Sequence, residues 1–176
     1  MRCFVAIDLP EDICKKIGEI KSEINNKKFI KIASEPHITL KFIGEVEEKQ
    51  KNHIIENLKK IEYKPFEVAI KGIGVFPNFK YIRVIWLGCF SKDLEKLAEI
   101  IRNQLKEFNP EDEKFVGHIT IARLKNKPDN DIYNFIEKYK NIEIGKFLVK
   151  DFKLKRSVLT QKGAIYSDIY QFELMK

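Results

Sequence analysis

Positions 36–41 of the chain read "PHITLK", and positions 117–123 read "GHITIAR". The chain contains only three histidines, and two of them open the same His-Ile-Thr tripeptide. For a chain of this composition, the odds of such a repeat by accident are roughly one in ten thousand or less. The repeat therefore indicates that the two segments share a structural and a chemical role.

Both copies of the tripeptide have the alternation of a half-buried β-strand. Because alternate side chains of a strand share a face, His37, Thr39 and Lys41 are expected on one face. By the same rule, His118 and Thr120 share a face in the second copy. The residues between them are isoleucine or leucine in both copies and supply a core. The polar face of each strand is therefore expected to line water or a cleft.

Strands alternate with helices along the rest of the chain. Apolar residues at spacings of three and four indicate the helices, and Pro10 and Ser91 favour two of the helix starts. Each half of the chain carries two helices, several strands and one copy of the motif, which suggests a duplicated α+β unit with two sheets facing each other. The expected strands cover residues 2–9, 28–34, 37–44, 66–76, 81–89, 118–124, 143–159 and 164–174, and the expected helices cover 10–25, 47–61, 91–108 and 129–139.

The composition is that of a globular protein, with 176 residues of which 44% are apolar and 34% charged. No linker or change of composition divides it, so we expect a single domain over residues 1–176. The net charge of +7 favours a polyanionic partner such as nucleic acid, although lysine-rich helix faces in contact with solvent would also account for it. No secretory signal, membrane span or paired-cysteine pattern is visible. We therefore expect a cytoplasmic monomer that does not bind a membrane.

Three other roles would also use two histidines. A lone His-x-Thr is usually an exposed part of a strand, but the repeat argues against this role. A zinc site needs three or four ligands, and no Cys, Asp or Glu stands at a ligand spacing beside either motif. No segment resembles the nucleophile elbow of a serine hydrolase. No metal and no other cofactor is therefore expected.

In-line displacement at phosphorus is chemistry that uses this residue set. One imidazole removes a proton from the attacking oxygen, and the other protonates the leaving oxygen on the opposite side of the phosphorus. Histidine suits both steps because its ordinary pKa, about 6.5, lies near neutral pH. A threonine hydroxyl two residues further on can donate to a non-bridging phosphate oxygen. No metal is required where protein donors neutralise the developing charge.

The sequence also resembles a known family. The segments "HITL" and "HITI" match the two His-x-Thr-x motifs of the two-histidine phosphoesterases. Over most of the chain, "MRCFVAIDLPEDI", "PHITLKFIGEV", "GIGVFPN", "RVIWLG", "GHITIARLK" and "KRSVL" are similar to the RNA 2′,3′-cyclic phosphodiesterases, historically called 2′-5′ RNA ligases. The resemblance implies an α+β fold of two pseudo-symmetric lobes, with antiparallel sheets facing a central basic cleft and helices on the outside.

The resemblance further implies metal-free hydrolysis of an RNA-terminal 2′,3′-cyclic phosphate to a 2′-phosphate, with tRNA fragments among the candidate RNAs. Carried over by motif, His37 is the general acid that protonates the departing ribose O3′, and His118 is the general base that activates water. Thr39 and Thr120 hold phosphate oxygens. The family often has an aromatic residue and an asparagine shortly before the first motif, whereas this chain has "KIASEPH". Contacts to the nucleotide are therefore expected to differ there.

Three basic residues are further candidates for substrate binding. Lys41 has the alternation for the cleft, although a lysine that extends to solvent from a sheet edge would fit equally well. Arg123 matches the arginine that follows the family's second motif, but it needs a bulge or an edge position to share the face of Thr120. Arg156 would close the cleft from another strand. Three aromatic residues are candidates for stacking on a base, with packing in the core or on the surface as the commoner role: Phe76, Phe79 and Tyr166.

Two classes of function remain. The favoured one is an enzyme that opens cyclic phosphates at RNA ends, and RNA ligation would be its reverse reaction with the same acid and base. The alternative is a non-catalytic RNA-end or nucleotide-binding module built on the same cleft. The histidines favour the enzyme, because lysine or arginine would hold positive charge at every pH.

Overall fold

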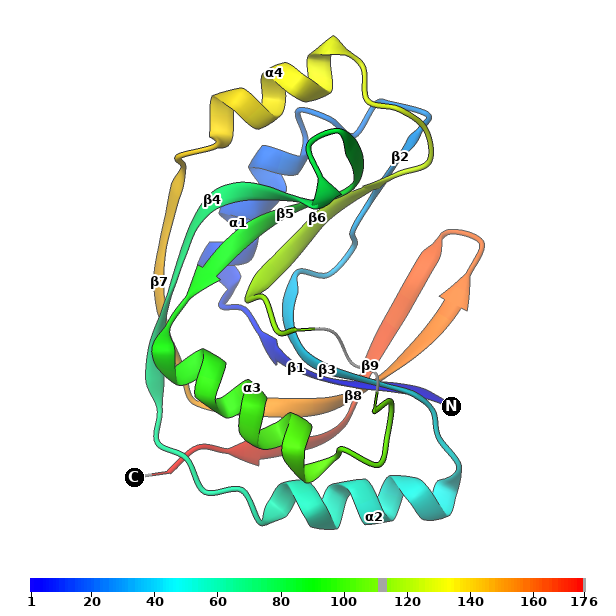
Figure 1. Cartoon of the computed structure of the whole chain (residues 1–176), viewed down its shortest axis with the longest axis vertical. Helices are drawn as coiled ribbons and strands as arrows, with labels where there is room; N and C mark the ends of the chain where they lie inside the picture. Colours follow the sequence, from blue (N-terminus) through cyan, green and yellow to red (C-terminus); the bar gives the residue numbers. More distant parts are fainter. Residues whose placement is uncertain (111–113, 176) are drawn as a thin grey trace.

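Two antiparallel sheets and four helices make up the described part of the chain, a computed structural model that covers residues 1–110 and 114–175 (Figure 1). The predicted elements are present with different ends, except that residues 143–159, expected as one strand, form two strands on either side of Lys150 that belong to different sheets. In chain order they are β1 (Arg2–Asp8), α1 (Glu11–Lys21), β2 (Ile30–Ile32), β3 (His37–Glu45), α2 (Glu48–Lys59), β4 (Phe66–Asn78), β5 (Tyr81–Phe90), α3 (Lys92–Gln104), β6 (His118–Leu124), α4 (Asn130–Tyr139), β7 (Glu143–Val149), β8 (Asp151–Thr160) and β9 (Gly163–Glu173).

Each sheet contains one strand that carries the repeated motif. The four-stranded sheet, here called sheet A, has the order β3-β1-β8-β9, and the five-stranded sheet B has the order β2-β6-β5-β4-β7. The first motif therefore begins the edge strand β3 of sheet A, and the second begins the inner strand β6 of sheet B. The predicted α+β fold of two antiparallel sheets with helices on the outside is confirmed.

The chain passes repeatedly from one sheet to the other. It crosses between β1 and β2, between β2 and β3, between β3 and β4, and between β7 and β8. Helix α1 follows a strand of sheet A but packs against β6 and β7 of sheet B, whereas α3 follows a strand of sheet B and contacts β3 of sheet A. Neither half of the sequence therefore forms one sheet with its own helices, and sheet A combines strands from both ends of the chain.

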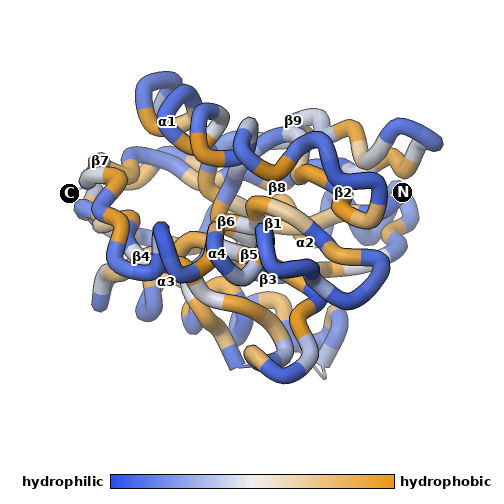
Figure 2. The backbone as a smooth tube through the Cα atoms, turned by 90° about the horizontal axis from the view of Figure 1, so that it is seen from above, coloured by the Kyte–Doolittle hydropathy of each residue, from blue (hydrophilic) through white to orange (hydrophobic). Residues whose placement is uncertain are grey.

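One cluster of buried apolar residues connects both sheets and the helices. In α3, the Ser91 side chain accepts a hydrogen bond from the backbone N–H of Leu94 at 3.2 Å, and Leu94, Leu97 and Ile101 are fully buried. Burial of each such side chain contributes about 1.5–3 kcal/mol. Hydrophobic and hydrophilic residues alternate along the strands and helices (Figure 2). No helix of the described residues is long and apolar enough to span a bilayer.

Two helices end earlier than their apolar periodicity predicts. Helix α1 ends at Lys21 and α3 at Gln104, four residues before the predicted ends at 25 and 108. Ile24 and Leu105 lie beyond these ends and are still buried. The spacing of apolar residues therefore continues into turns that pack on the same core, which is why the sequence pattern overestimates the helix length.

Candidate active site

Strands β3 and β6 each contain a bulge at the same place, directly after the His-x-Thr segment. In β3 the register with β1 passes from Thr39 to Lys41, so Leu40 is the additional residue. In β6 the register with β5 passes from Thr120 to Ala122, so Ile121 is the additional residue. The first seven residues of the two strands have the same sequence of buried and exposed positions. A bulge reverses the alternation of side chains beyond it.

The bulge in β3 changes the assignment of Lys41. Lys41 is only 3% exposed, and its Nζ donates to the backbone oxygen of Asn109, in the segment after α3. Phe42, which is 50% exposed, lies on the motif face instead, with its ring 6.3 Å from that of Phe4. The prediction that Lys41 shares the face of His37 is therefore wrong, because strict alternation does not hold across the bulge.

The bulge in β6 has the opposite consequence for Arg123. It returns Arg123 to the face of His118 and Thr120, which strict alternation would not. Burial lowers the pKa of His118, and the positive charge of Arg123 lowers it further. Burial raises the pKa of Tyr166 in β9 of sheet A, and the charge of Arg123 opposes that rise. Arg123 therefore lies between the two sheets, close to a side chain of each.

The two motif histidines are held by equivalent hydrogen bonds. Nδ1 of His37 lies 2.9 Å from the backbone oxygen of Glu35, and Nδ1 of His118 lies 2.6 Å from that of Val116. A carbonyl oxygen can only accept, so Nδ1 carries the proton in both rings. In the neutral imidazole, Nε2 is then left as the proton acceptor. Both rings are therefore oriented for proton transfer at Nε2.

His37 is enclosed by two aromatic rings of sheet A. Its ring centroid lies 5.2 Å from that of Phe4 and 5.0 Å from that of Tyr166. Burial is the largest cause of a pKa below the ordinary histidine value, and the positive charge of His118 lowers the pKa further. The two imidazoles are therefore close enough across the cleft to influence each other's protonation.

His118 is enclosed in the same way by two rings of sheet B. Its centroid lies 5.0 Å from that of Phe76 and 5.8 Å from that of Trp86. The Trp86 indole lies over Gly74, where an added Cβ would come within 2.2 Å of indole atoms. Only glycine leaves room for the indole at this position. Phe79, by contrast, lies at the β4–β5 turn and is 61% exposed, with no ring contact to either histidine.

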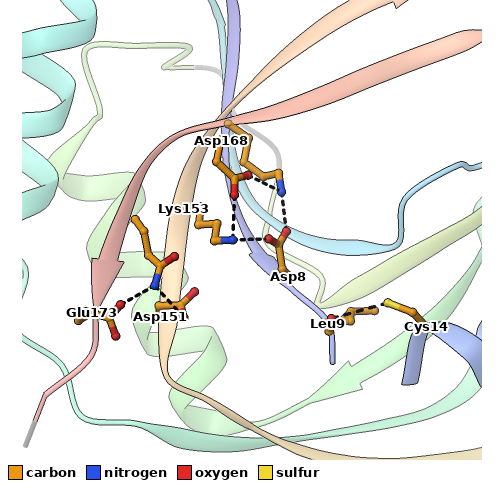
Figure 3. A network of polar contacts seen from close by, with 9 residues as sticks. Asp8, Leu9, Cys14, Asp151, Lys153, Asp168 and Glu173 are labelled. Atoms are coloured by element: carbon orange, nitrogen blue, oxygen red, sulfur yellow. Dashed lines mark hydrogen bonds and ion pairs between the residues drawn. The ribbon is translucent and has the colours of Figure 1, made fainter. Parts of the chain in front are cut away.

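A network of four charged residues joins β1, β8 and β9 (Figure 3), and one of them, Asp8, is the register partner of His37. Lys153 Nζ lies 2.8 Å from Asp8 and 2.9 Å from Asp168, and Lys155 Nζ lies 2.6 Å and 3.0 Å from the same two carboxylates. A pocket of about 240 Å³ opens at this point, and its lining includes His37, Asp8 and Lys155. Sequence reasoning missed this network, although lysines at alternate positions of one strand indicate a shared face.

Arg156 lies on the other face of β8. It is the register partner of Cys3, which is buried in the core, whereas Lys155 is the partner of Phe4 on the cleft face. Burial raises the pKa of the Cys3 thiol, and the charge of Arg156 lowers it. The register therefore places Arg156 on the face away from the cleft, contrary to the prediction, whereas Lys155 lies on the cleft face and lines the pocket beside His37.

Both motif segments of the chain are similar to known proteins. The family model described as LigT like phosphoesterase matches residues 7–86 and 88–166, so each matched segment contains one motif. The RNA 2′,3′-cyclic phosphodiesterase of Archaeoglobus fulgidus is 38% identical over 98% of this chain and 100% of its own length. The protein of the same name from Methanocaldococcus jannaschii is also 38% identical, over 98% of this chain and 100% of its own.

Solved structures show the same fold. The crystal structure of TT0787 of Thermus thermophilus aligns with a TM-score of 0.84 and 28% identity, covering 99% of this chain and 98% of that one. Escherichia coli LigT, in its complex with 3′-AMP, has a TM-score of 0.80 over 99% of this chain and 98% of its own, at 22% identity. The match of the family model over both motif segments and the 38% identity to the archaeal relatives show that the chain belongs to the LigT-like phosphoesterase family.

Proposed function

We propose that the protein hydrolyses a 2′,3′-cyclic phosphate at an RNA end to a 2′-phosphate, with His37 as general acid and His118 as general base. The observation that carries this proposal is the equivalence of the two imidazoles. They stand on different sheets, within electrostatic reach of each other, and both have Nδ1 fixed by a backbone carbonyl. The names of the archaeal relatives support an RNA cyclic phosphate as the substrate.

The proposed step moves one proton at each histidine. As the water oxygen bonds to phosphorus, Nε2 of His118 takes the proton that water loses. The bond from phosphorus to O3′ breaks, and O3′ takes the proton of Nε2 of His37. Each transfer typically contributes about 10²–10⁴-fold to the rate. A ribose 5′-hydroxyl in place of water would give a 2′-5′ linkage by the same exchange, so ligation belongs to the same proposal.

The negative charge that develops on the non-bridging oxygens is assigned to protein donors. These are the hydroxyls of Thr39 and Thr120, which share the faces of the two histidines. Fixed donors of this kind stabilise a transition state without reorganising. In the part of the chain that the structure describes, no group of three or more His, Cys, Asp or Glu is arranged to hold a metal ion. The proposal therefore routes no step through a metal.

The wider setting is part of the same proposal. We place the reaction in the cytoplasm, with tRNA fragments among the substrates and the chain acting as a monomer in one bilobal domain over residues 1–176. The free thiols of Cys3, Cys14 and Cys89 support a reducing compartment.

The test is to incubate the purified protein with a nucleoside 2′,3′-cyclic phosphate in the presence of EDTA and to identify the product by phosphorus NMR. We expect the 2′-phosphate alone. A 3′-phosphate would mean that the other ester bond breaks. Loss of activity in EDTA, restored by a divalent ion, would contradict the metal-free step, and tight binding without turnover would favour the binding module.

A further inference from the structure

Lys31 of β2 lies in the same row of sheet B as Arg123. The row consists of residues that are register partners across four strands: Lys31, Arg123, Val84 and Phe76. Partners in a row share one face of the sheet. Because Phe76 contacts His118, this is the cleft face. Thr120 belongs to the next row on that face, roughly 7 Å away at the ordinary rise of a strand.

The positive charges of Lys31 and Arg123 lie directly opposite each other, an arrangement that by itself destabilises a sheet. Within residues 1–110 and 114–175, neither side chain makes a hydrogen bond or an ion pair. On sheet A the situation is reversed, because Lys153 and Lys155 are each paired with two carboxylates. Sheet B therefore presents two uncompensated cations side by side at the cleft.

The β8–β9 hairpin positions the stem of Lys31. An added Cβ on Gly163 would lie 3.6 Å from Cε of Lys31, so the stem passes over the hairpin turn. The Ser34 hydroxyl donates to the backbone oxygen of Ala164 at 3.3 Å, which fixes the hairpin to the segment after β2. Lys31 is therefore held where the two sheets meet, beyond Arg123 as seen from the histidines.

We propose that Lys31 and Arg123 together bind the phosphodiester that precedes the terminal nucleotide of the RNA. This inference rests on the proposed function, in which the terminal cyclic phosphate is held by the histidines and threonines. The preceding phosphate is the next negative charge along the RNA. The Lys31–Arg123 pair is the next uncompensated positive charge along the cleft face of sheet B. A nucleoside cyclic phosphate lacks this group. The substrate class is therefore a dinucleotide or longer RNA in preference to a mononucleotide.

Three substrates test the proposal: a nucleoside 2′,3′-cyclic phosphate, a dinucleotide with the same end, and that dinucleotide with a neutral methylphosphonate as its internal linkage. Lys31→Met keeps the stem over Gly163 and removes the charge, and Lys31→Arg restores the charge. Lys28→Met, at an exposed lysine in the turn before β2, is the matched control. Thermal unfolding of each variant checks that it is folded.

We expect Lys31→Met to lower the ratio of kcat/KM between dinucleotide and nucleoside about 5- to 10-fold. Lys31→Arg and Lys28→Met should keep the ratio of the unmodified protein. The methylphosphonate should lower the ratio for the unmodified protein by a similar factor and have little further effect on Lys31→Met. The dependence of log kcat/KM for the dinucleotide on log salt should also become shallower, by about 0.7 for one lost phosphate contact.

An unchanged ratio in Lys31→Met overturns the inference, and so does an equal loss for both substrates. If the unmodified protein hydrolyses neither substrate, the proposed function fails by itself. Calorimetric binding of the dinucleotide 2′-phosphate and its methylphosphonate analogue then decides the inference. A preference for the charged linkage that is lost in Lys31→Met would support it, and equal affinity for the two would overturn it.

Discussion

Asp8 stands directly opposite His37 in the ladder between β1 and β3, and its carboxylate is shared by the ammonium groups of Lys153 and Lys155. Burial is the largest cause that lowers the pKa of His37, and the nearby charge of Lys155 lowers it further, whereas the charge of Asp8 raises it. Asp8 therefore offsets the lysines that would otherwise make the proposed acid harder to protonate.

The substitution Asp8→Asn tests this balance. It removes the negative charge beside His37 and leaves the ammonium of Lys155 paired with Asp168 alone, so the pKa of His37 should fall. The alkaline limb of kcat/KM should then move to lower pH, with an activity loss of about 3- to 10-fold at pH 7. Asp12→Asn, in the first turn of α1, is the matched control. An alkaline limb that does not move in Asp8→Asn would show that Asp8 only stabilises the sheet.

The direction in which the pKa values of the two histidines shift predicts where the pH profile of the unmodified protein lies. The proposed reaction needs His118 neutral and His37 charged, and burial lowers the pKa of both in the free protein. Both limbs of the bell for kcat/KM should therefore lie on the acid side of the ordinary value of about 6.5.

Bound phosphate is negative and raises both pKa values, so the bell for kcat should lie at higher pH than the bell for kcat/KM. Steady-state rates between about pH 4 and 9 would measure both profiles. The limbs describe the coupled pair of histidines and not single residues. Coincident profiles for kcat and kcat/KM would contradict the assignment of the limbs to groups that contact the substrate phosphate.

Substitution of each histidine separates the acid from the base. His37→Ala and His118→Ala should each lose about 10²–10⁴-fold with an RNA cyclic phosphate. A substrate whose leaving group is better than ribose O3′ needs no proton donor, so it should rescue His37→Ala far more than His118→Ala. Single-turnover rates with the two substrates measure the rescue. The opposite pattern would exchange the two roles.

Two glycines offer a matched test of the wall beside His118. Gly74→Ala places a Cβ within 2.2 Å of the Trp86 indole, so the ring must move away. We expect this overpacking to cost about 1–3 kcal/mol of stability and, because Trp86 contacts His118, at least about 10-fold in kcat/KM.

Gly18→Ala is the control for this test, because nothing lies within 4 Å of an added Cβ in α1. Alanine there should stabilise the protein by about 0.5–1 kcal/mol and leave the rate unchanged. Denaturant unfolding and kcat/KM of both variants provide the comparison. A Gly74→Ala protein with ordinary stability and rate would show that the indole position is not important.

The predictions from sequence failed where the backbone departs from regular alternation. The faces of His37 and His118 follow from the repeated motif, but nothing in "HITLKF" marks Leu40 as an additional residue. Strict alternation therefore places Lys41 on the wrong face. For Arg123, the sequence shows only that a bulge or an edge position is needed to reach the face of Thr120, and not that a bulge is present. Arg156 is a different case, because it has the same parity as the buried Phe152 and Leu154 and its position on the core face was readable. The Asp8–Lys155 contact joins residues far apart in the chain, which local patterns do not reveal.

The four crossings of the chain between the sheets also bear on how the cleft can move. Two sheets can open about a hinge only where the chain segments that connect them are few and lie at one side. Here α1 and α3 each connect one sheet to the other, and the hydrogen bond from Ser34 to Ala164 holds the β8–β9 hairpin to the segment after β2. We therefore expect the gap between the imidazoles to stay nearly constant from one turnover to the next. An RNA end would then enter and leave a site that is already assembled, with no closing motion to wait for.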